Sequence, residues 1–182
     1  DLAIYLEGVP INLPAHVHGI GYTDVHFLIP NAISGMNLIK GPFDLRYGDF
    51  AVAGAVDMQL SSEFKAQELS ASVGQFATFS DRVHLSHRGT SGWAAASAEY
   101  FHTDGYTSNG NWDGVRFLGK AGYRKGHVIL GAYASEWDAA DTIPLAAVQS
   151  GDLGYFDGVD GSDGGSSRRG HLSGQFEQRL GH

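Results

Sequence analysis

The chain has 182 residues, no cysteine and a formal net charge of −8, because 12 lysines and arginines face 20 aspartates and glutamates. This length allows one domain, or one domain and part of another, and the acidic balance argues against a general nucleic-acid-binding protein. No run approaches the roughly 18 apolar residues of a transmembrane helix. The 26 glycines and the aromatic content (10 Phe, 8 Tyr, 3 Trp) favour an all-β chain with many turns.

The first part of the chain reads as short strands joined by polar loops. Residues 2–7 alternate weakly and predict a short strand, which Gly8-Val9-Pro10 ends with a turn. Residues 12–26 have the proline, glycine and histidine content of a loop. Asn31 is placed to cap a short helix over residues 31–34, and a strand pattern returns at residues 36–39.

Residues 39–60 form the most distinctive stretch of the chain. Gly41-Pro42 marks a turn, Arg46-Tyr47-Gly48 follows, and small residues then fill positions 51–56. The glycines at 41, 48 and 54 predict positions that need a positive φ or a close approach of the backbone.

After residue 60, segments of about ten residues alternate between apolar and polar positions, which is typical of a transmembrane β-barrel. Strands are predicted at residues 68–74, 79–88, 93–102, 115–124, 127–137 and 171–180. In the fourth of these, one face should meet lipid and the other the barrel lumen. The expected lipid-facing residues are Val115, Phe117, Ala121 and Tyr123, and the expected lumen-facing residues are Arg116, Lys120 and Arg124.

The connections between these strands alternate in length. Residues 88–93 and 124–127 are short, whereas 103–114 and 138–170 are long, as expected for periplasmic turns and extracellular loops. The turn near residues 74–76 would be a small extracellular loop. A soluble β-sandwich could produce the same alternation, so periodicity alone leaves both interpretations open.

The stretch 39–60 resembles the end of the plug domain of TonB-dependent outer-membrane receptors, through Gly41, Pro42, Arg46, Tyr47, Gly48 and Gly54. Residues 5–11 are similar to a plug strand of that family. Asp141-Thr142-Ile143-Pro144 and residues 161–165 are similar to an extracellular loop of some members. The resemblance covers nearly the whole chain. It implies an all-β-dominated fold, with the C-terminal part of a plug in residues 1–60 and antiparallel strands of a transmembrane β-barrel in residues 61–182. These would be about six of the roughly 22 strands of the family's barrels.

The resemblance also implies a function. Such receptors take up a scarce ligand, such as a siderophore, metal chelate, cobalamin or oligosaccharide, across the outer membrane of a Gram-negative bacterium. The implied partners are outer-membrane lipid, the ligand and a TonB-type energising complex of the inner membrane, whose contact box is not in this sequence; no cofactor and no nucleic acid are expected. We interpret the chain as an internal fragment, because it starts without Met and ends within a strand pattern. The alternative is a soluble all-β ligand-binding module of the carbohydrate type, with Trp112, Trp137 and Tyr155 as platforms.

Candidate ligand residues lie in three loops. They are His16, His18, His26, Asn109, Trp112, Asp141, Asp157, Asp160 and Asp163. His16 and His18 are weak metal candidates, and a polar loop that binds no metal is the simpler interpretation. The aspartate spacing in the last loop does not match an EF-hand, which favours a solvated acidic loop.

No catalytic motif groups the serines, histidines and aspartates, so no enzyme is predicted. Arg46 and Asp57 are expected to pair with charged residues of the barrel wall, such as Glu99 or Arg116, because a buried charge needs a partner.

Overall fold

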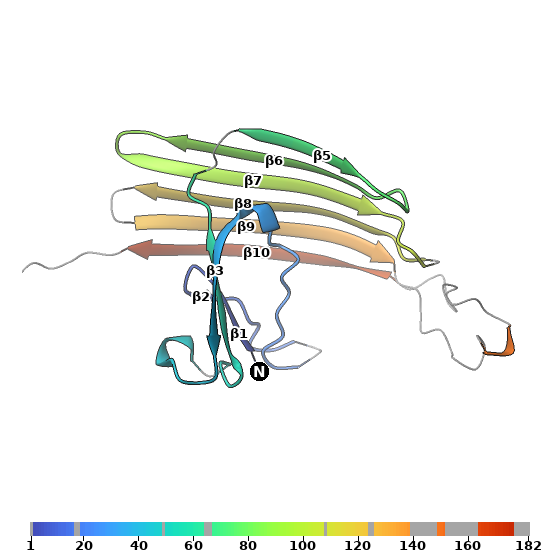
Figure 1. The fold of residues 1–182 in the computed structure, drawn as a ribbon, viewed down its shortest axis with the longest axis horizontal. Coiled ribbons are helices and arrows are strands. Elements are labelled where there is room, and N and C mark those ends of the chain that lie inside the picture. The colour runs from blue at the N-terminus through green and yellow to red at the C-terminus, as the bar shows by residue number, and fades with distance from the viewer. Residues whose placement is uncertain are drawn as a thin grey trace, which may run out of the picture.

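The computed structural model describes residues 2–16, 19–48, 50–63, 67–107, 109–123, 126–138, 149–151 and 164–176, which form two β-sheets (Figure 1). The first sheet has four strands in the order β2-β1-β4-β3, with β1 parallel to β4 and the other pairs antiparallel. Its strands are β1 (Leu2–Leu6), β2 (Val9–Pro10), β3 (Ile33–Lys40) and β4 (Gly54–Leu60). Among the described residues, no helix is long and apolar enough to cross a membrane.

The second sheet is an antiparallel meander in which each strand pairs with its neighbour in sequence. Its strands are β5 (Glu68–Val73), β6 (Phe79–Arg88), β7 (Gly92–Thr103), β8 (Trp112–Tyr123), β9 (Gly126–Asp138) and β10 (Gly164–Phe176). The predicted all-β architecture is therefore confirmed, and β6 has the predicted bounds.

Two local predictions differ from the structure. The predicted helix over residues 31–34 is wrong: a single 3-10 turn covers Pro30–Ala32, without a side-chain cap, and Ile33 already begins β3. Pro30 presets the turn at its first position, and pairing with β4 then extends the chain. The last strand begins at Gly164 and not at 171, because residues 164–170 pair with β9 although their sequence lacks apolar alternation. Residues 177–180 lie outside the described part.

The core lies between the two sheets. Phe27, Leu28 and Ile29, in the connection between β2 and β3, are buried against Leu118 of β8 and Ile129 of β9, both only 1% exposed. Burying side chains of this size contributes roughly 1.5–3 kcal/mol each. The connection is thereby fixed against one face of the large sheet, called here the inner face.

A second cluster stabilises the far end of the small sheet. The Tyr5 hydroxyl donates to the Tyr47 carbonyl oxygen at 2.5 Å, and the two rings meet edge to face at 4.9 Å. Burial raises the pKa of Tyr5, which keeps its phenol protonated as a donor. Tyr47 belongs to a 3-10 turn, η2 (Leu45–Tyr47), inside the stretch 39–60.

The glycines of this stretch have left-handed backbone angles. The φ values of Gly41, Gly48 and Gly54 are +75°, +61° and +139°. A Cβ at Gly54 would lie 2.2 Å from the Ile39 carbonyl oxygen, so the position has no room for a side chain. An added Cβ at Gly48 would meet only the Tyr5 hydroxyl, at an ordinary contact distance of 3.9 Å, so this position requires glycine for its backbone conformation.

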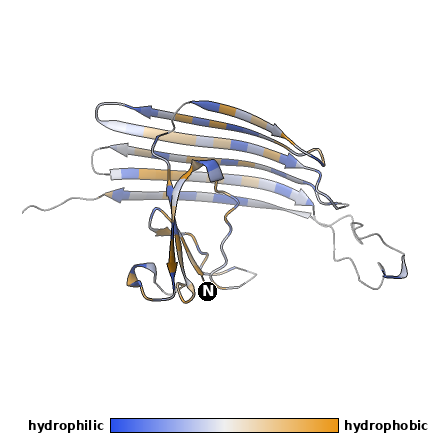
Figure 2. Cartoon of the chain, viewed as in Figure 1, coloured by the Kyte–Doolittle hydropathy of each residue, from blue (hydrophilic) through white to orange (hydrophobic). Residues whose placement is uncertain are grey.

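The other face of the large sheet, called here the outer face, is apolar and exposed. Polar and apolar residues alternate along its strands (Figure 2). The exposed apolar and aromatic side chains on the outer face are Leu69, Val73, Leu85, Tyr100, Val115, Tyr123, Val128, Leu130, Leu172 and Phe176. From the inner face, Arg116 contacts the β2–β3 connection and Lys120 contacts the turn between β1 and β2, as the alternation in β8 predicted. Arg124 lies outside the described residues.

Candidate ligand-binding site

A cavity of about 760 Å³ lies where the connection between β2 and β3 meets the ends of β8, β9 and β10. It opens at the end of the large sheet from which the two long connections, residues 104–111 and 139–163, leave. Its lining comes from both parts of the chain: Leu13, His16, Tyr22, Asp24 and His26, with Gly110, Asn111, Trp112, Tyr133, Trp137, Asp138, Ser167, Arg168 and Arg169.

Aromatic rings form much of this lining. The His26 ring lies 6.4 Å from the rings of Trp112 and Tyr133, which are 6.5 Å from each other. His16 stacks on Tyr22 at 4.2 Å. Such rings offer large, rigid contact surfaces with polar tips, which suits a bulky ligand with planar or apolar faces.

Arg169 holds the connection that carries these rings. Its guanidinium donates to the carbonyl oxygens of Asp24 at 2.8 Å and Ile11 at 3.0 Å, and it lies 4.3 Å from the centre of the Phe27 ring. Within the connection, the Asp24 carboxylate accepts from the His26 backbone N–H at 2.8 Å. The site is thus positioned before any ligand arrives, which lowers the entropic cost of binding.

Asn12 closes the base of the same connection. Its side-chain oxygen accepts from the Ile4 N–H at 2.7 Å, and its amide group donates to the carbonyl oxygens of Leu2 at 3.1 Å and Gly21 at 3.0 Å. One side chain therefore satisfies backbone groups of β1 and of the loop together.

Further along the inner face, charged residues link the two sheets. Lys120 Nζ lies 2.5 Å from Glu7 Oε1, and the same oxygen accepts from the Leu60 N–H at 2.7 Å. Arg116 donates to the Leu28 carbonyl oxygen at 3.1 Å. Lys120 thus fixes the turn between β1 and β2, which Glu7 also joins to β4 through Leu60. Arg116 fixes the buried β2–β3 connection.

The pairing predicted for Arg46 and Asp57 is wrong. Arg46 pairs with Asp44 at 2.6 Å on the surface, where the guanidinium lowers the pKa of that carboxyl, and the Asp57 carboxylate accepts from the Gly8 N–H. Glu99 instead faces Arg82 at 2.5 Å and Arg116 at 3.3 Å. These three residues are direct cross-strand neighbours, so strand register decides the pairing.

Three sequence-predicted ligand residues line the cavity: His16, His26 and Trp112. Asn109 lies in the same connection as the lining residue Asn111, and their role in binding stays a prediction. His18, Asp141, Asp157, Asp160 and Asp163 lie outside the described residues. In the part of the chain that the structure describes, no three His, Asp or Glu side chains converge as a metal site.

The sequence did not single out several lining residues. Tyr22, Asp24, Tyr133 and Arg169 all reach the cavity. Tyr133 occupies a position of β9 whose side chain faces inward, and the alternation of the sequence could have shown this. Arg169 lies in a glycine- and serine-rich run without a strand signal, so nothing local pointed to it.

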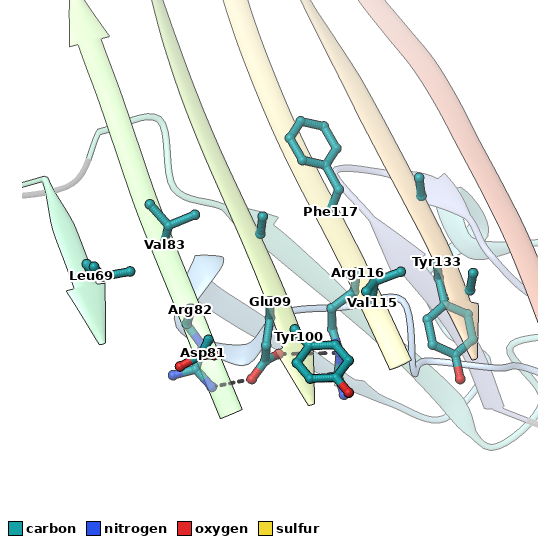
Figure 3. A pocket seen from close by; sticks show the side chains of 13 residues that line it. Leu69, Asp81, Arg82, Val83, Glu99, Tyr100, Val115, Arg116, Phe117 and Tyr133 are labelled. Atoms are coloured by element: carbon teal, nitrogen blue, oxygen red, sulfur yellow. Dashed lines mark hydrogen bonds and ion pairs between the residues drawn. The ribbon is translucent and has the colours of Figure 1, made fainter. Parts of the chain in front are cut away.

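A different concavity, of about 510 Å³, lies on the outer face (Figure 3). Leu69, Val83, Val115 and Phe117 are among its lining residues, and it faces away from the small sheet. It shares Tyr133 with the cavity between the two sheets and is otherwise lined by different residues.

No family model matches the chain, and no curated protein matches it. Solved structures do. The copper transporter OprC matches with a TM-score of 0.56 and 16% identity over 77% of this chain and 24% of its own. The siderophore receptor PiuA from Acinetobacter baumannii matches with a TM-score of 0.53 and 15% identity, over 74% of this chain and 19% of its own. The pyoverdine outer-membrane receptor FpvA from Pseudomonas aeruginosa PAO1, bound to pyoverdine, matches with a TM-score of 0.53 and 14% identity, over 76% of this chain and 22% of its own.

The chain thus spans about a fifth to a quarter of the length of these proteins. At such identities the likeness concerns the fold, and it confirms the fold that the sequence predicted: the end of a plug followed by antiparallel barrel strands, as in TonB-dependent outer-membrane receptors. These neighbours are a copper transporter, a siderophore receptor and a pyoverdine receptor.

Proposed function

We propose that this chain, which has the plug-and-barrel fold of TonB-dependent receptors, forms part of an outer-membrane receptor for energised ligand uptake. Residues 1–60 would be the C-terminal part of the plug, and residues 61–182 the first strands of the barrel. A TonB-type complex of the inner membrane would supply the energy. The fold of the solved neighbours supports this assignment.

One observation carries the proposal. The cavity takes its lining from the plug connection and from the barrel wall together, so a bound ligand touches both. A ligand can shift a conformational equilibrium only through contacts that differ between the two states. Contacts shared between plug and wall are of that kind, because any movement of the plug changes them.

The outer face supports a membrane location. Aromatic residues lie toward both ends of its strands, with Phe79 and Tyr100 at one end (5.3 Å apart) and Tyr123 and Phe176 at the other, while Phe117 lies between them. The eight residue steps from Val115 to Tyr123 span about 26 Å along β8, comparable to the apolar band of about 25 Å on membrane barrels. The soluble carbohydrate-binding alternative would leave this whole face in water and is not favoured.

The ligand belongs to the group of siderophores, metal chelates, cobalamin and oligosaccharides. A chelate or another ligand with planar or apolar faces fits the ring-lined cavity better than a bare metal ion, for which the described residues offer no cluster of three ligands. The neighbours' own ligands are copper for OprC and pyoverdine for FpvA.

The test is ligand binding by the purified intact receptor. A panel of ferric pyoverdine, copper(II), cyanocobalamin and a maltooligosaccharide is titrated, and tryptophan fluorescence and calorimetry are recorded. Trp112→Ala should raise the Kd of the bound panel member about tenfold or more, as expected for a buried aromatic contact. Tyr123→Ala, an aromatic change on the outer face, is the matched control and should leave the Kd unchanged.

A second variant tests the long connection. Deleting residues 150–163, which leaves β10 complete, should spare barrel assembly and weaken uptake of the same panel member. Wild-type binding by Trp112→Ala together with wild-type uptake by the deletion would place the ligand site elsewhere.

A further inference from the structure

The connection between β7 and β8, residues 104–111, forms one rim of the ligand cavity. Gly110, Asn111 and the first residue of β8, Trp112, line the cavity there. The Asn111 carbonyl oxygen accepts from the Asp138 N–H at 2.9 Å, which ties this rim to the end of β9. Whatever holds the two ends of the connection therefore also sets the position of this part of the cavity wall.

The backbone brings the two ends of the connection close together. The φ of Gly105 is +74°, and a Cβ there would lie 2.2 Å from the Gly110 carbonyl oxygen, so the close approach requires glycine. The Gly105 N–H donates to Thr103 Oγ1 at 3.1 Å. The Asp104 N–H donates at 2.9 Å to the Phe76 carbonyl oxygen, in the turn between β5 and β6. The start of the connection is thus held by the neighbouring turn as well as by its own strand.

His102, the last but one residue of β7, joins both ends through its side chain. Its Nε2 lies 3.3 Å from Asp104 Oδ1, and its Nδ1 lies 2.9 Å from Asp113 Oδ1. The same Asp113 oxygen accepts from the Tyr100 hydroxyl at 2.8 Å, and the Phe79 ring lies 5.2 Å from the imidazole. Asp104 is the first residue of the connection and Asp113 the second residue of β8. One imidazole therefore bridges the two ends of the connection.

The charge state of this imidazole decides how many of its contacts are hydrogen bonds. A neutral ring has one N–H and can donate to one carboxylate, whereas the imidazolium donates to both. Two further acids flank the cluster on the same face, since Asp81 pairs in register with Tyr100, and Glu136 with Asp113. The bridge between the two ends is therefore complete only when His102 is charged.

We propose that His102 is a positioning residue for ligand binding: its imidazolium fixes the two ends of the connection and thereby holds the cavity rim formed by residues 110–112. His102 does not line the cavity and acts through the connection. A rim that is already in place lowers the entropic cost of binding a ligand. The bridge is present while His102 is protonated and is lost as the pH rises, so the rim is best ordered at mildly acidic pH. The inference rests on the proposed function only in taking this cavity as the ligand site.

The experiment follows backbone hydrogen exchange in the purified, ligand-free intact receptor. After correction for intrinsic exchange rates, protection of the Asp104 and Asp138 N–H groups in wild type should fall as the pH rises from about 5 to about 8, where histidine loses its charge. His102→Gln keeps a polar side chain without the charge. It should speed exchange of both groups about tenfold at the acidic end, the effect of one charge-assisted hydrogen bond, and remove the pH dependence. Asp104→Asn, which weakens one exposed contact, should speed exchange by up to about fivefold.

The matched control is His87→Gln, the same change on an exposed histidine at the opposite end of the outer face, which should behave as wild type. The Kd of the bound panel member should rise about tenfold in His102→Gln at about pH 5 and match that of wild type at about pH 8. Wild-type exchange in His102→Gln, faster exchange at Asp104 without any at Asp138, or an unchanged Kd at acidic pH would overturn the proposal. A receptor that binds no panel member refutes the proposed function, while exchange in the ligand-free receptor still decides the role of His102.

Discussion

The two faces of the six-stranded sheet are made by the same strands and differ in almost every property. On the inner face, Arg82, Glu99, Arg116 and Lys120 each have an ion-pair partner within the chain. On the outer face, apolar side chains are exposed, and the exposed fraction of Val73 reaches 90%. The inner face is complementary to one specific neighbour, whereas the outer face is suited to a surrounding that forms no hydrogen bonds.

The inner face itself serves two purposes. Arg82 and Glu99 pair across neighbouring strands and thus stabilise the large sheet itself. Lys120 and Arg169 reach the rest of the chain, through Glu7 and through the backbone of the β2–β3 connection. Arg116 does both, because it faces Glu99 and also donates to the Leu28 carbonyl oxygen.

The largest effect is expected from breaking the charge network within the wall. Glu99 is buried, with its side chain 4% exposed, between two arginines. Glu99→Gln leaves both guanidinium groups without a carboxylate and should cost about 3–5 kcal/mol of unfolding free energy. Urea unfolding of the receptor in micelles, followed by heat-modifiable electrophoretic mobility, measures the loss.

The matched control is an acid on the opposite face of the adjacent strand. Asp81 is exposed on the outer face and has no ion pair among the residues that the structure describes. Asp81→Asn should change the unfolding free energy by less than about 0.5 kcal/mol. Equal losses for the two variants would show that the inner network is not held in a buried environment.

A smaller effect is expected from placing a charge on the outer face. Leu130 is exposed and pairs with Gly119, midway between the rows of Val115 and Tyr123. Leu130→Arg should cost roughly 2–4 kcal/mol if this level of β9 lies at the bilayer midplane. Leu130→Ala, which removes the side chain without adding charge, should cost much less in the same unfolding assay. Similar costs would contradict lipid contact at this face.

Much of this contrast could be predicted from the sequence, because strand alternation is a local property with a period of two. The pattern Val115, Arg116, Phe117 already assigns the faces of β8, and the bounds of β6 agree with its alternation. The need for a positive φ or a close backbone approach at position 54 could also be predicted, because the residue there is a glycine.

The contacts between the faces and the plug could not be predicted in this way. Lys120 and Glu7 are 113 residues apart, and Arg169 and Ile11 are 158 apart. Such pairs depend on where the first 60 residues dock against the large sheet, which no local period encodes. Arg46 is a different case: its partner Asp44 lies only two residues away, so the pairing is local, and the expected partner on the large sheet is wrong.

The smallest effect concerns glycines on the two faces. Gly131 of β9 lies on the inner face, where an added Cβ would stand 3.3–3.4 Å from Leu118, His171 and Phe27. Gly131→Leu should therefore push the buried plug connection away from the wall and cost about 1–3 kcal/mol through overpacking. Gly170 of β10 lies on the outer face with no heavy atom within 4 Å of an added Cβ, so Gly170→Leu should cost little, because its side chain extends away from the sheet. Unfolding free energies of the two variants in the same micelles measure the difference. An equal loss in both would mean that the plug does not pack on the wall at Phe27, and the distinction between a complementary inner face and an unspecific outer face would fail there.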